Sequence, residues 1–301
     1  MANTPLVTIY ITTKNRIQLL ERAINSAVNQ DYENIEIIIV DDGSTDGTME
    51  YLAEKSKANT RIKYLVNTTS LGACASRNRA IFSATGEFIT GLDDDDYFLP
   101  NRISDFIHAW HKKSETTIAL CSDTEIKLSI RKTKTTRRPK TIKRHNLIDA
   151  NLVGNQVFTK TKTLIEHCGF DINFPAWQDL ELWYRLLALE HSQIECTNQK
   201  TYITDISHPH ERISTNKIDR IEEAHKLFSD KHSLLPLEIE ILSVQLSDYD
   251  NRQQRLTTLA KKLYRSPTKE NFIKILGLTA RRLLKRKIHK NNKTNKTNNR
   301  N

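Results

Sequence analysis

The sequence lacks any run of about 18 apolar residues, the length that a membrane-spanning helix requires. We therefore expect no transmembrane segment. Residues 1–5 contain neither a basic stretch nor an apolar core, so we also expect no signal peptide. Cysteine is scarce: the four residues lie far apart and form no CxxC pair. This favours free thiols in a reducing cytosol and argues against a zinc site.

Acidic residues are missing from two stretches of the chain. Residues 127–144 contain nine Lys or Arg, and residues 277–301 contain another nine. The net charge is +10, so residues 1–276 together carry only about +1 (10 − 9). Two basic stretches on an otherwise acidic body favour contact with an anionic surface. The alternative is a solvated loop at 127–144 and a disordered tail at 290–301, which contains only Lys, Asn, Thr and Arg.

Apolar patterning predicts strands that alternate with helices. Continuous or β-branched apolar runs predict strands at residues 6–11, 35–40, 62–66, 87–92, 117–121 and 155–158. Helical spacing begins at Ile17, near Asp46, at Gly72 and after Asn101, which we expect to cap its helix. Later helices are expected at 180–189 and from Lys217 onward. The alternation predicts a mostly parallel α/β sheet, whose ligands bind beyond the carboxyl ends of the strands.

Four consecutive aspartates, Asp93–Asp96, directly follow the apolar strand at 87–92. Carboxylates packed this closely repel one another unless a cation neutralises them. Mg²⁺ and Mn²⁺ prefer oxygen ligands and often bridge to substrate phosphates, so the run predicts a metal–diphosphate site. A charged turn before a helix is the alternative. Asp42, which also follows a buried strand, is a candidate to bind a nucleobase or ribose, or else an ordinary turn residue.

Five segments in this order resemble motifs of glycosyltransferase family 2, which has the GT-A fold. They are VTIYITTKNR at 7–16, IIIVDDGSTDGT at 37–48, GACASRNRA at 72–80, LDDDDYFLP at 92–100 and GFDINFPAWQDLELWYRL at 169–186. The resemblance covers roughly residues 5–215 and is more specific than any single motif. It predicts three parts: a GT-A domain at 1–215, a helical region at 216–289 and the tail at 290–301.

The resemblance assigns roles to individual residues. It implies nucleotide binding by Thr12, Arg16, Asp42, Arg77, Asp93 and Asp94, with Thr12 and Asp42 at a uracil ring. It implies metal binding by Asp93, Asp95 and His210, support of the site by Asp96 and Asn78, acceptor contact by Gln178 and Glu181, and catalysis by Asp179. A surface charge on its helix is the alternative for Glu181. The family usually has Pro at the position of Thr12 and Glu at that of Gln178, so Asp179 would act as the base alone.

Two tryptophans flank Asp179, and aromatic faces suit the apolar faces of sugar rings. We favour acceptor contact for Trp177. For Trp183, on the apolar face of its helix, we favour core packing.

These roles predict an inverting transfer from a UDP-sugar. Asp179 would take the proton of the acceptor hydroxyl, and a divalent cation, Mn²⁺ or Mg²⁺, would offset charge on the leaving diphosphate. We expect a glycan or lipid-linked glycan acceptor of lipopolysaccharide core, O-antigen or capsule synthesis. A basic amphipathic helix at 272–288 would hold the enzyme at the inner face of a bacterial cytoplasmic membrane.

Two other functions are compatible with parts of the sequence. Nucleotidyltransferases share this kind of sheet, but they usually carry a glycine-rich loop where residues 12–16 have no glycine. A non-enzymatic nucleic-acid binder would use the basic stretches, yet neither stretch interleaves aromatic residues with its charges. We therefore expect no nucleic-acid partner.

Overall fold

The computed structural model describes residues 4–129, 131–208 and 218–248. The chain forms two compact units. The first comprises Met1–Leu147 and Asn151–Arg212, and the second comprises Ile148–Ala150 and Ile213–Asn301. The predicted boundary at 215 stays a prediction, and the tail at 290–301 and the helix at 272–288 lie outside the described residues.

An eight-stranded sheet forms the centre of the first unit, in the order β3-β2-β1-β4-β10-β6-β11-β9. Its strands are β1 Val7–Thr13, β2 Ile35–Asp41, β3 Ile62–Val66, β4 Phe88–Asp93, β6 Thr117–Cys121, β9 Thr141–Ile142, β10 Phe158–Lys160 and β11 Gln193–Cys196. β1 runs parallel to β2 and β4, and β2 runs parallel to β3. β10 lies antiparallel between β4 and β6. The prediction of a mostly parallel sheet is confirmed.

The strand expected at 155–158 is wrong in position, because β10 begins only at Phe158. The polar groups just before it bond to other parts of the unit. The Asn155 amide donates to Asp93, and the backbone carbonyl of Gln156 accepts from Arg102 at 2.7 Å. Asn155 and Gln156 therefore bond to the end of β4 and to the start of α4 (Arg102–Trp110), and they are not part of a strand.

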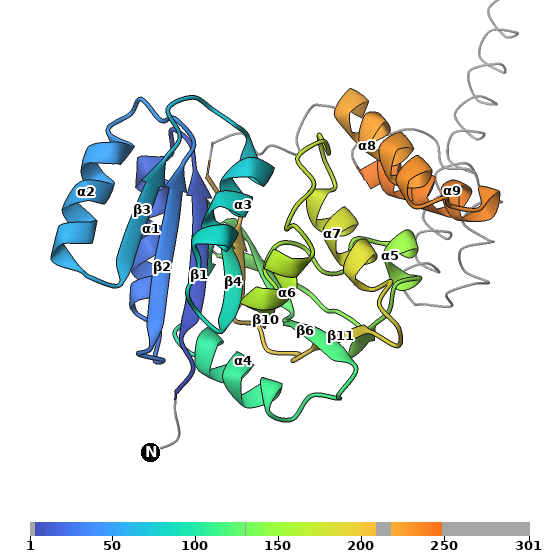
Figure 1. The fold of residues 1–301 in the computed structure, drawn as a ribbon, viewed down its shortest axis with the longest axis horizontal. Helices are drawn as coiled ribbons and strands as arrows, with labels where there is room; N and C mark the ends of the chain where they lie inside the picture. The colour runs from blue at the N-terminus through green and yellow to red at the C-terminus, as the bar shows by residue number, and fades with distance from the viewer. Residues whose placement is uncertain (1–3, 130, 209–217, 249–301) are drawn as a thin grey trace, which may run out of the picture. The chain divides into compact units, whose positions relative to one another are not determined.

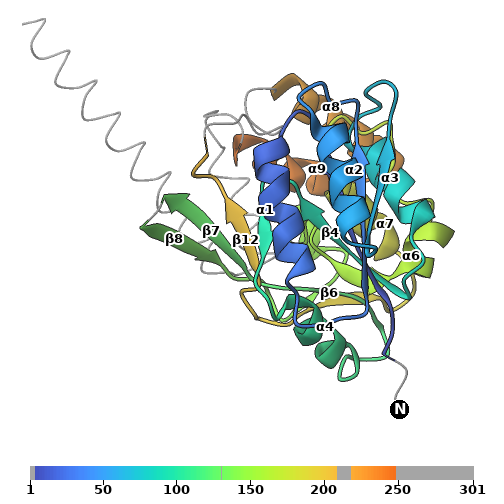
Figure 2. The same ribbon diagram turned by 90° about the vertical axis from the view of Figure 1, so that its left-hand side faces the viewer.

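Helices cover both faces of this sheet (Figure 1). They are α1 Ile17–Val28, α2 Thr48–Ala58, α3 Ala73–Ser83, α4 Arg102–Trp110, α6 Thr161–Glu166 and α7 Gln178–Leu186. The short α5, Asn146–Asp149, contributes residues to both units. Figure 2 shows α1 and α2 beside each other in front of the strands. Alternate residues of β1, such as Ile9 and Ile11, share a core cluster with Leu20 and Ile24 of α1. Successive side chains of a strand point to opposite faces, so each buried strand serves both layers.

Asn101 occupies the position before α4, but the prediction that its side chain caps the helix is wrong. Its amide donates to the carboxylate of Asp105 at 2.8 Å instead. Arg102, the first residue of α4, is completely buried, and its guanidinium bonds to Ser122 and to the carbonyl of Gln156. The start of α4 is therefore fixed by a buried arginine.

A second sheet of four strands has the order β5-β12-β7-β8. Its strands are β5 Tyr97–Phe98, β7 Thr124–Ser129, β8 Lys132–Thr136 and β12 Tyr202–Asp205. β7 and β8 pair antiparallel, and the end of β7 and all of β8 lie in the basic stretch 127–144. The reading of that stretch as a loop is therefore wrong for its first part, although Lys132 and Lys134 are exposed as a solvated stretch would require.

Helices make up the described part of the second unit, which agrees with the predicted helical extension. They are α8 Ile218–Lys231, α9 Pro236–Leu242 and a 3₁₀ helix at Ser243–Asp248. Phe228 of α8 and Ile241 of α9 are fully buried. None of the helices in the described parts of the chain has the length and apolar character needed to cross a membrane. The cysteines, all within the described ranges, are free thiols, as predicted.

Candidate active site

The carboxyl ends of β1, β2 and β4 lie side by side and bring together residues that are far apart in the sequence. Thr12 pairs with Val40 on one side and with Asp93 on the other. Asp42 directly follows β2, and its backbone N–H donates to the Thr13 carbonyl at 2.9 Å. The sheet thus gathers the predicted nucleotide-binding and metal-binding residues at one edge.

Asp42 is buried, and its carboxylate is saturated with hydrogen bonds. The donors are Asn67 Nδ2 (2.7 Å), Ser70 Oγ (2.7 Å), the Leu71 amide (2.8 Å), the Gly72 amide (3.0 Å) and Ser76 Oγ (3.0 Å). Burial alone would raise the pKa of Asp42, but these bonds outweigh it and lower the pKa to about 2. Asp42 therefore holds the segment 67–72 against β2 as a permanent anion.

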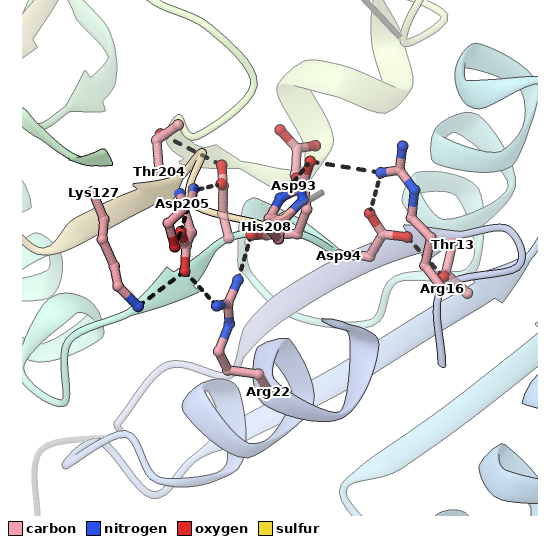
Figure 3. A network of polar contacts seen from close by, with 12 residues as sticks. Thr13, Arg16, Arg22, Asp93, Asp94, Lys127, Thr204, Asp205 and His208 are labelled. Carbon is pink, nitrogen blue, oxygen red and sulfur yellow. Dashed lines mark hydrogen bonds and ion pairs between the residues drawn. The ribbon is translucent and has the colours of Figure 1, made fainter. Parts of the chain in front are cut away.

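Asp94 is committed to the loop after β1 (Figure 3). Its Oδ2 accepts from Thr13 Oγ1 at 2.8 Å, and its Oδ1 pairs with Arg16 Nη1 at 3.1 Å. Burial raises the pKa of Asp94 to about 6, against the opposing effect of Arg16. Arg16 also approaches Asp95 Oδ2 at 3.6 Å. The predicted nucleotide-side residues Arg16 and Asp94 thus form a partly buried ion pair at the acidic run.

Asp95 and Asp96 face the end of β12. His208 Nε2 lies 3.8 Å from Asp95 Oδ2, and the Asp96 carboxylate accepts from the Asp205 amide at 3.0 Å. Asp205 in turn pairs with Lys127 at 3.1 Å (Figure 3). The turn after β12 is therefore tied to the acidic run. The predicted ligand His210 lies outside the described residues.

Asp205 is an anchor that the sequence analysis missed. Besides Lys127, it pairs with Arg22 of α1 at 2.5 Å and accepts from the Ser207 hydroxyl at 2.6 Å. Burial would raise the pKa of Asp205, but hydrogen bonds from Ser207 and Lys127 hold it well below its usual range. Arg22 also donates to the Asp95 carbonyl at 2.5 Å, so a side chain of α1 holds the backbone of the acidic run in place.

Arg77, on α3, connects the acidic run with the segment that carries the candidate base. Its Nη2 lies 3.2 Å from Asp93 Oδ1, and its Nη1 lies 3.2 Å from Gln178 Oε1. The next residue, Asn78, exchanges two hydrogen bonds of 2.7 Å with the backbone of Phe170. α3 thus joins the motifs at 92–100 and 169–186.

Asp179 is the second residue of α7, which begins two residues before the predicted helix at 180–189. Its Oδ1 accepts from the Leu180 amide at 2.9 Å, and its Oδ2 accepts from Asn151 Nδ2 at 2.9 Å. Trp177 precedes the helix in the left-handed conformation, with φ 56°, and is buried. Its predicted acceptor contact stays a prediction.

Two other residues of α7 have structural partners. The Trp183 ring is buried and its Nε1 donates to the Gly154 carbonyl at 2.9 Å, which confirms core packing. Glu181 is fully buried and pairs with Arg185 at 3.0 Å. The alternative of Glu181 as a surface charge is therefore wrong, and its predicted acceptor contact stays a prediction.

Asn151 and Asn155 are further residues that the sequence analysis missed. Asn151 lies in a segment without regular patterning, and Asn155 was placed in a strand. A polar amide that interrupts an apolar run next to a glycine was the available signal. Asn155 bonds to Asp93, and Asn151 bonds to Asp179.

The donor atoms near Asp93 and Asp95 suit a divalent cation that also binds phosphates. Mg²⁺ and Mn²⁺ sites of this kind use one or two carboxylates, and the substrate supplies further oxygens. Within the described ranges, no set of three or more His, Cys, Asp or Glu side chains is arranged to hold a metal ion alone.

Comparison with known proteins places this geometry in a family context. A family model described as glycosyl transferase family 2 matches residues 8–169. The chain is 36% identical over 252 residues to the putative colanic acid biosynthesis glycosyl transferase WcaA of Escherichia coli K12, covering 76% of this chain and 88% of that one. It is 42% identical over 103 residues to the Escherichia coli UDP-Glc:alpha-D-GlcNAc-diphosphoundecaprenol beta-1,3-glucosyltransferase WfaP, covering 34% of this chain and 40% of that one.

A crystal structure of Staphylococcus aureus TarS, residues 1–349 in complex with UDP-GlcNAc, has a similar fold. The TM-score is 0.63 at 20% identity, with 90% of this chain and 79% of that chain covered. At this identity the likeness concerns the arrangement of the strands and helices.

Proposed function

Because the chain belongs to glycosyltransferase family 2, we propose that it transfers one sugar from a UDP-sugar to a lipid-linked glycan with inversion at the anomeric carbon. The chain is a glycosyltransferase with the GT-A fold, and its relatives act in the synthesis of surface polysaccharides. UDP-GlcNAc in TarS and UDP-Glc in the name of WfaP support a UDP-sugar donor. The diphosphoundecaprenol in the name of WfaP supports a lipid-linked acceptor.

The observation that carries this proposal is the double contact of Arg77. One guanidinium nitrogen reaches Asp93, at the end of β4, and another reaches Gln178, the neighbour of Asp179. A donor bound at the edge of the sheet would therefore lie close to the side chain that we propose as the base. An inverting transfer needs this arrangement, since the acceptor hydroxyl must attack from the face opposite the leaving diphosphate.

In this proposal, Asp179 is the general base. Its Oδ1 accepts from the Leu180 amide and its Oδ2 accepts from Asn151, so each oxygen keeps a further lone pair that would take the proton of the acceptor hydroxyl. Such a base contributes about 10²–10⁴ to the rate. Gln178 has no basic group at neutral pH, so Asp179 would act alone. Thr12 would bind the uracil, Asp42 would shape the uracil pocket by holding the segment 67–72 in place, and Asp93 would contact the ribose or the diphosphate.

Asp93 and Asp95 would hold a divalent cation, Mn²⁺ or Mg²⁺, together with a late histidine, His210 in the family motif. His208, two residues before His210 and within the described residues, lies 3.8 Å from Asp95. The cation would offset the negative charge of the diphosphate leaving group. Arg16 and Arg77 line the same edge as fixed positive charges.

A panel of UDP-sugars tests the proposal, with diphosphate-linked lipid acceptors that end in different sugars. We expect one donor to yield a product of inverted configuration, detected by mass spectrometry and by the anomeric coupling constant in NMR. A product of retained configuration would contradict the inverting reaction. Transfer from GDP-sugars alone would contradict the role of Thr12 and Asp42 at uracil.

We also propose that the basic stretch 277–301 holds the enzyme at the inner face of the cytoplasmic membrane. Each Lys or Arg near an anionic leaflet contributes roughly 1 kcal/mol, so nine such residues suffice for reversible binding. Deletion of residues 268–301 should release the protein from phosphatidylglycerol vesicles in a sedimentation assay and preserve UDP binding. Vesicle binding that survives the deletion would overturn this anchor.

A further inference from the structure

Residues 151–155, here called the bridge segment, contact both carboxylates on which the proposed transfer depends. Asn151 Nδ2 donates to Asp179 Oδ2 at 2.9 Å. Four residues later, Asn155 Nδ2 donates to Asp93 Oδ1 at 3.0 Å. A single short segment therefore spans from the candidate base to the candidate donor-binding residue.

The orientation of the Asn155 amide is fixed by Tyr10 on β1. The Tyr10 hydroxyl donates to Asn155 Oδ1 at 2.6 Å. Burial raises the pKa of Tyr10 well above its usual value, so this hydroxyl stays protonated and remains a donor. Because the oxygen of the Asn155 amide faces Tyr10, its NH₂ group must face Asp93.

Two glycines allow the bridge segment to lie so close to the sheet. A Cβ atom on Gly91 of β4 would lie 2.6 Å from the Tyr10 hydroxyl and 2.8 Å from the Asn155 carbonyl oxygen, closer than real Cβ atoms come. Gly154 has φ +72°, a conformation that favours glycine. The close approach of Asn155 to β4 is therefore built into the sequence at positions 91 and 154.

The other side of the bridge segment is attached to α7 at two points. Trp183 Nε1 donates to the Gly154 carbonyl at 2.9 Å, and Asp179 accepts from Asn151. Trp183 is buried, so its ring gives a fixed attachment. The bridge segment thus joins β1 and β4 on one side with α7 on the other.

We propose that the bridge segment sets the position of Asp179 relative to Asp93, and that Asn151 and Asn155 are positioning residues for sugar transfer. This inference rests on the proposed function. Asn151 holds Oδ2 of the base in one rotamer, and Asn155 holds the carboxylate that faces the donor. Reacting groups must be held near their productive geometry, and a displacement of about 1 Å costs up to 10²-fold in rate.

Single substitutions test the two ends of the bridge segment separately. Asn151→Ala should lower kcat of transfer about tenfold, because the base loses its fixed rotamer, and should leave the UDP dissociation constant unchanged. Asn155→Ala should lower kcat and also weaken UDP binding, measured by calorimetry. Asn34→Ala, at an exposed asparagine remote from the site edge, is the matched control and should change neither quantity.

The double variant Asn151→Ala/Asn155→Ala tests whether the segment acts as a unit. We expect its kcat loss to be smaller than the product of the two single losses, since either substitution already frees the segment. Trp183→Phe removes the bond to Gly154 and keeps an aromatic ring, and it should lower kcat a few-fold with unchanged UDP binding.

The outcomes distinguish a failure of the bridge-segment proposal from a failure of the proposed function. If the wild-type enzyme transfers no sugar from any UDP donor, the proposed function fails. If it transfers sugar and Asn151→Ala keeps full kcat, or if the two losses multiply, the bridge segment does not position the base. Thermal melting of each variant guards against loss of the fold, and Trp183→Phe still tests the proposal if Asn155→Ala is unfolded.

Discussion

The proposed donor side of the site, at the ends of β1, β2 and β4, and the proposed acceptor side, on α7, hold their carboxylates in opposite ways. Asp42 accepts five hydrogen bonds, and its pKa is about 2. Asp179 accepts one bond from its own helix and one from Asn151, which is exposed. A carboxylate saturated by donors is a fixed anion that orients its surroundings and is a poor base. A carboxylate with fewer donors keeps lone pairs for an incoming proton.

This contrast agrees with the extent of the family match. The model of glycosyl transferase family 2 covers residues 8–169, which includes the donor side and ends before α7 begins at Gln178. Asp42 therefore lies within the matched range, and Asp179 lies outside it. The experiments below test whether the two sides really separate into nucleotide binding and proton transfer.

The largest effect is expected at the acidic run. Asp95→Ala should reduce transfer to an undetectable level, because the divalent cation loses a ligand that no neighbour replaces. EDTA should inactivate the wild type, and Mn²⁺ or Mg²⁺ should restore it. Product formation is measured by chromatography, and cation binding by calorimetry with UDP present. Full activity of the wild type in EDTA would contradict the proposed role of a divalent cation on the donor side.

The next effect tests the acceptor side alone. Asp179→Asn keeps the shape of the side chain and removes its basicity, so kcat should fall at least about 10²-fold. The UDP dissociation constant should stay within twofold of the wild-type value. Glu190→Gln, an exposed residue beyond the end of α7, is the control and should retain full activity. Weakened UDP binding with normal turnover of bound donor would make Asp179 a binding residue and erase the contrast between the two sides.

A smaller effect on turnover, with a clear effect on affinity, is expected for Asp42→Asn. The asparagine has one acceptor oxygen in place of two and adds a donor that faces other donors at 67–72. We expect UDP affinity to fall at least about tenfold and the free energy of unfolding to fall by about 2–3 kcal/mol. Calorimetry and denaturant unfolding measure the two quantities. If kcat at saturating donor fell as strongly as for Asp179→Asn, the donor side would not be a binding region alone.

Local patterns in the sequence predict most of the donor side. Continuous apolar runs locate β1 to β4, and the acidic residues that follow them must lie at one sheet edge because parallel strands end together. The bridge segment could not be predicted in this way. Asn151 and Asn155 act through contacts with β4, β1 and α7, which are distant in sequence. The full burial of Glu181 was not predicted either, because the family resemblance implies an acceptor contact there, with a surface charge as the alternative. Its partner Arg185 is held by the carbonyls of His167 and Gly169, which precede α7 by several residues.

Glu36 provides a comparison for Asp42, because its carboxylate is also saturated by hydrogen-bond donors but lies away from the site. It lies on β2, the strand that precedes Asp42, and it is also buried. Its carboxylate accepts from the Thr8 hydroxyl (2.5 Å), Lys63 Nζ (2.8 Å), the amide and hydroxyl of Thr85 (2.6 and 2.8 Å) and the Gly86 amide (3.0 Å). Glu36 is at the amino end of β2, remote from the site edge, so position and not saturation would separate the two residues.

The smallest effect on catalysis is therefore expected for Glu36→Gln, which should bind UDP and turn over like the wild type. Burial would raise the pKa of Glu36, but its hydrogen bonds outweigh this and lower the pKa from 4.5 to about 2. A lowered folded-state pKa stabilises the protein above the unfolded pKa, and this contribution is lost as the pH falls from about 4.5 towards 2. The variant should be less stable than the wild type by about 2 kcal/mol at pH 7, and the difference should shrink between pH 4.5 and 2.5. Urea unfolding of both proteins across this pH range measures the difference in stability. A difference independent of pH would mean that the ionised form of Glu36 does not contribute to stability. A loss of UDP binding would mean that a saturated carboxylate affects the donor site from either end of β2.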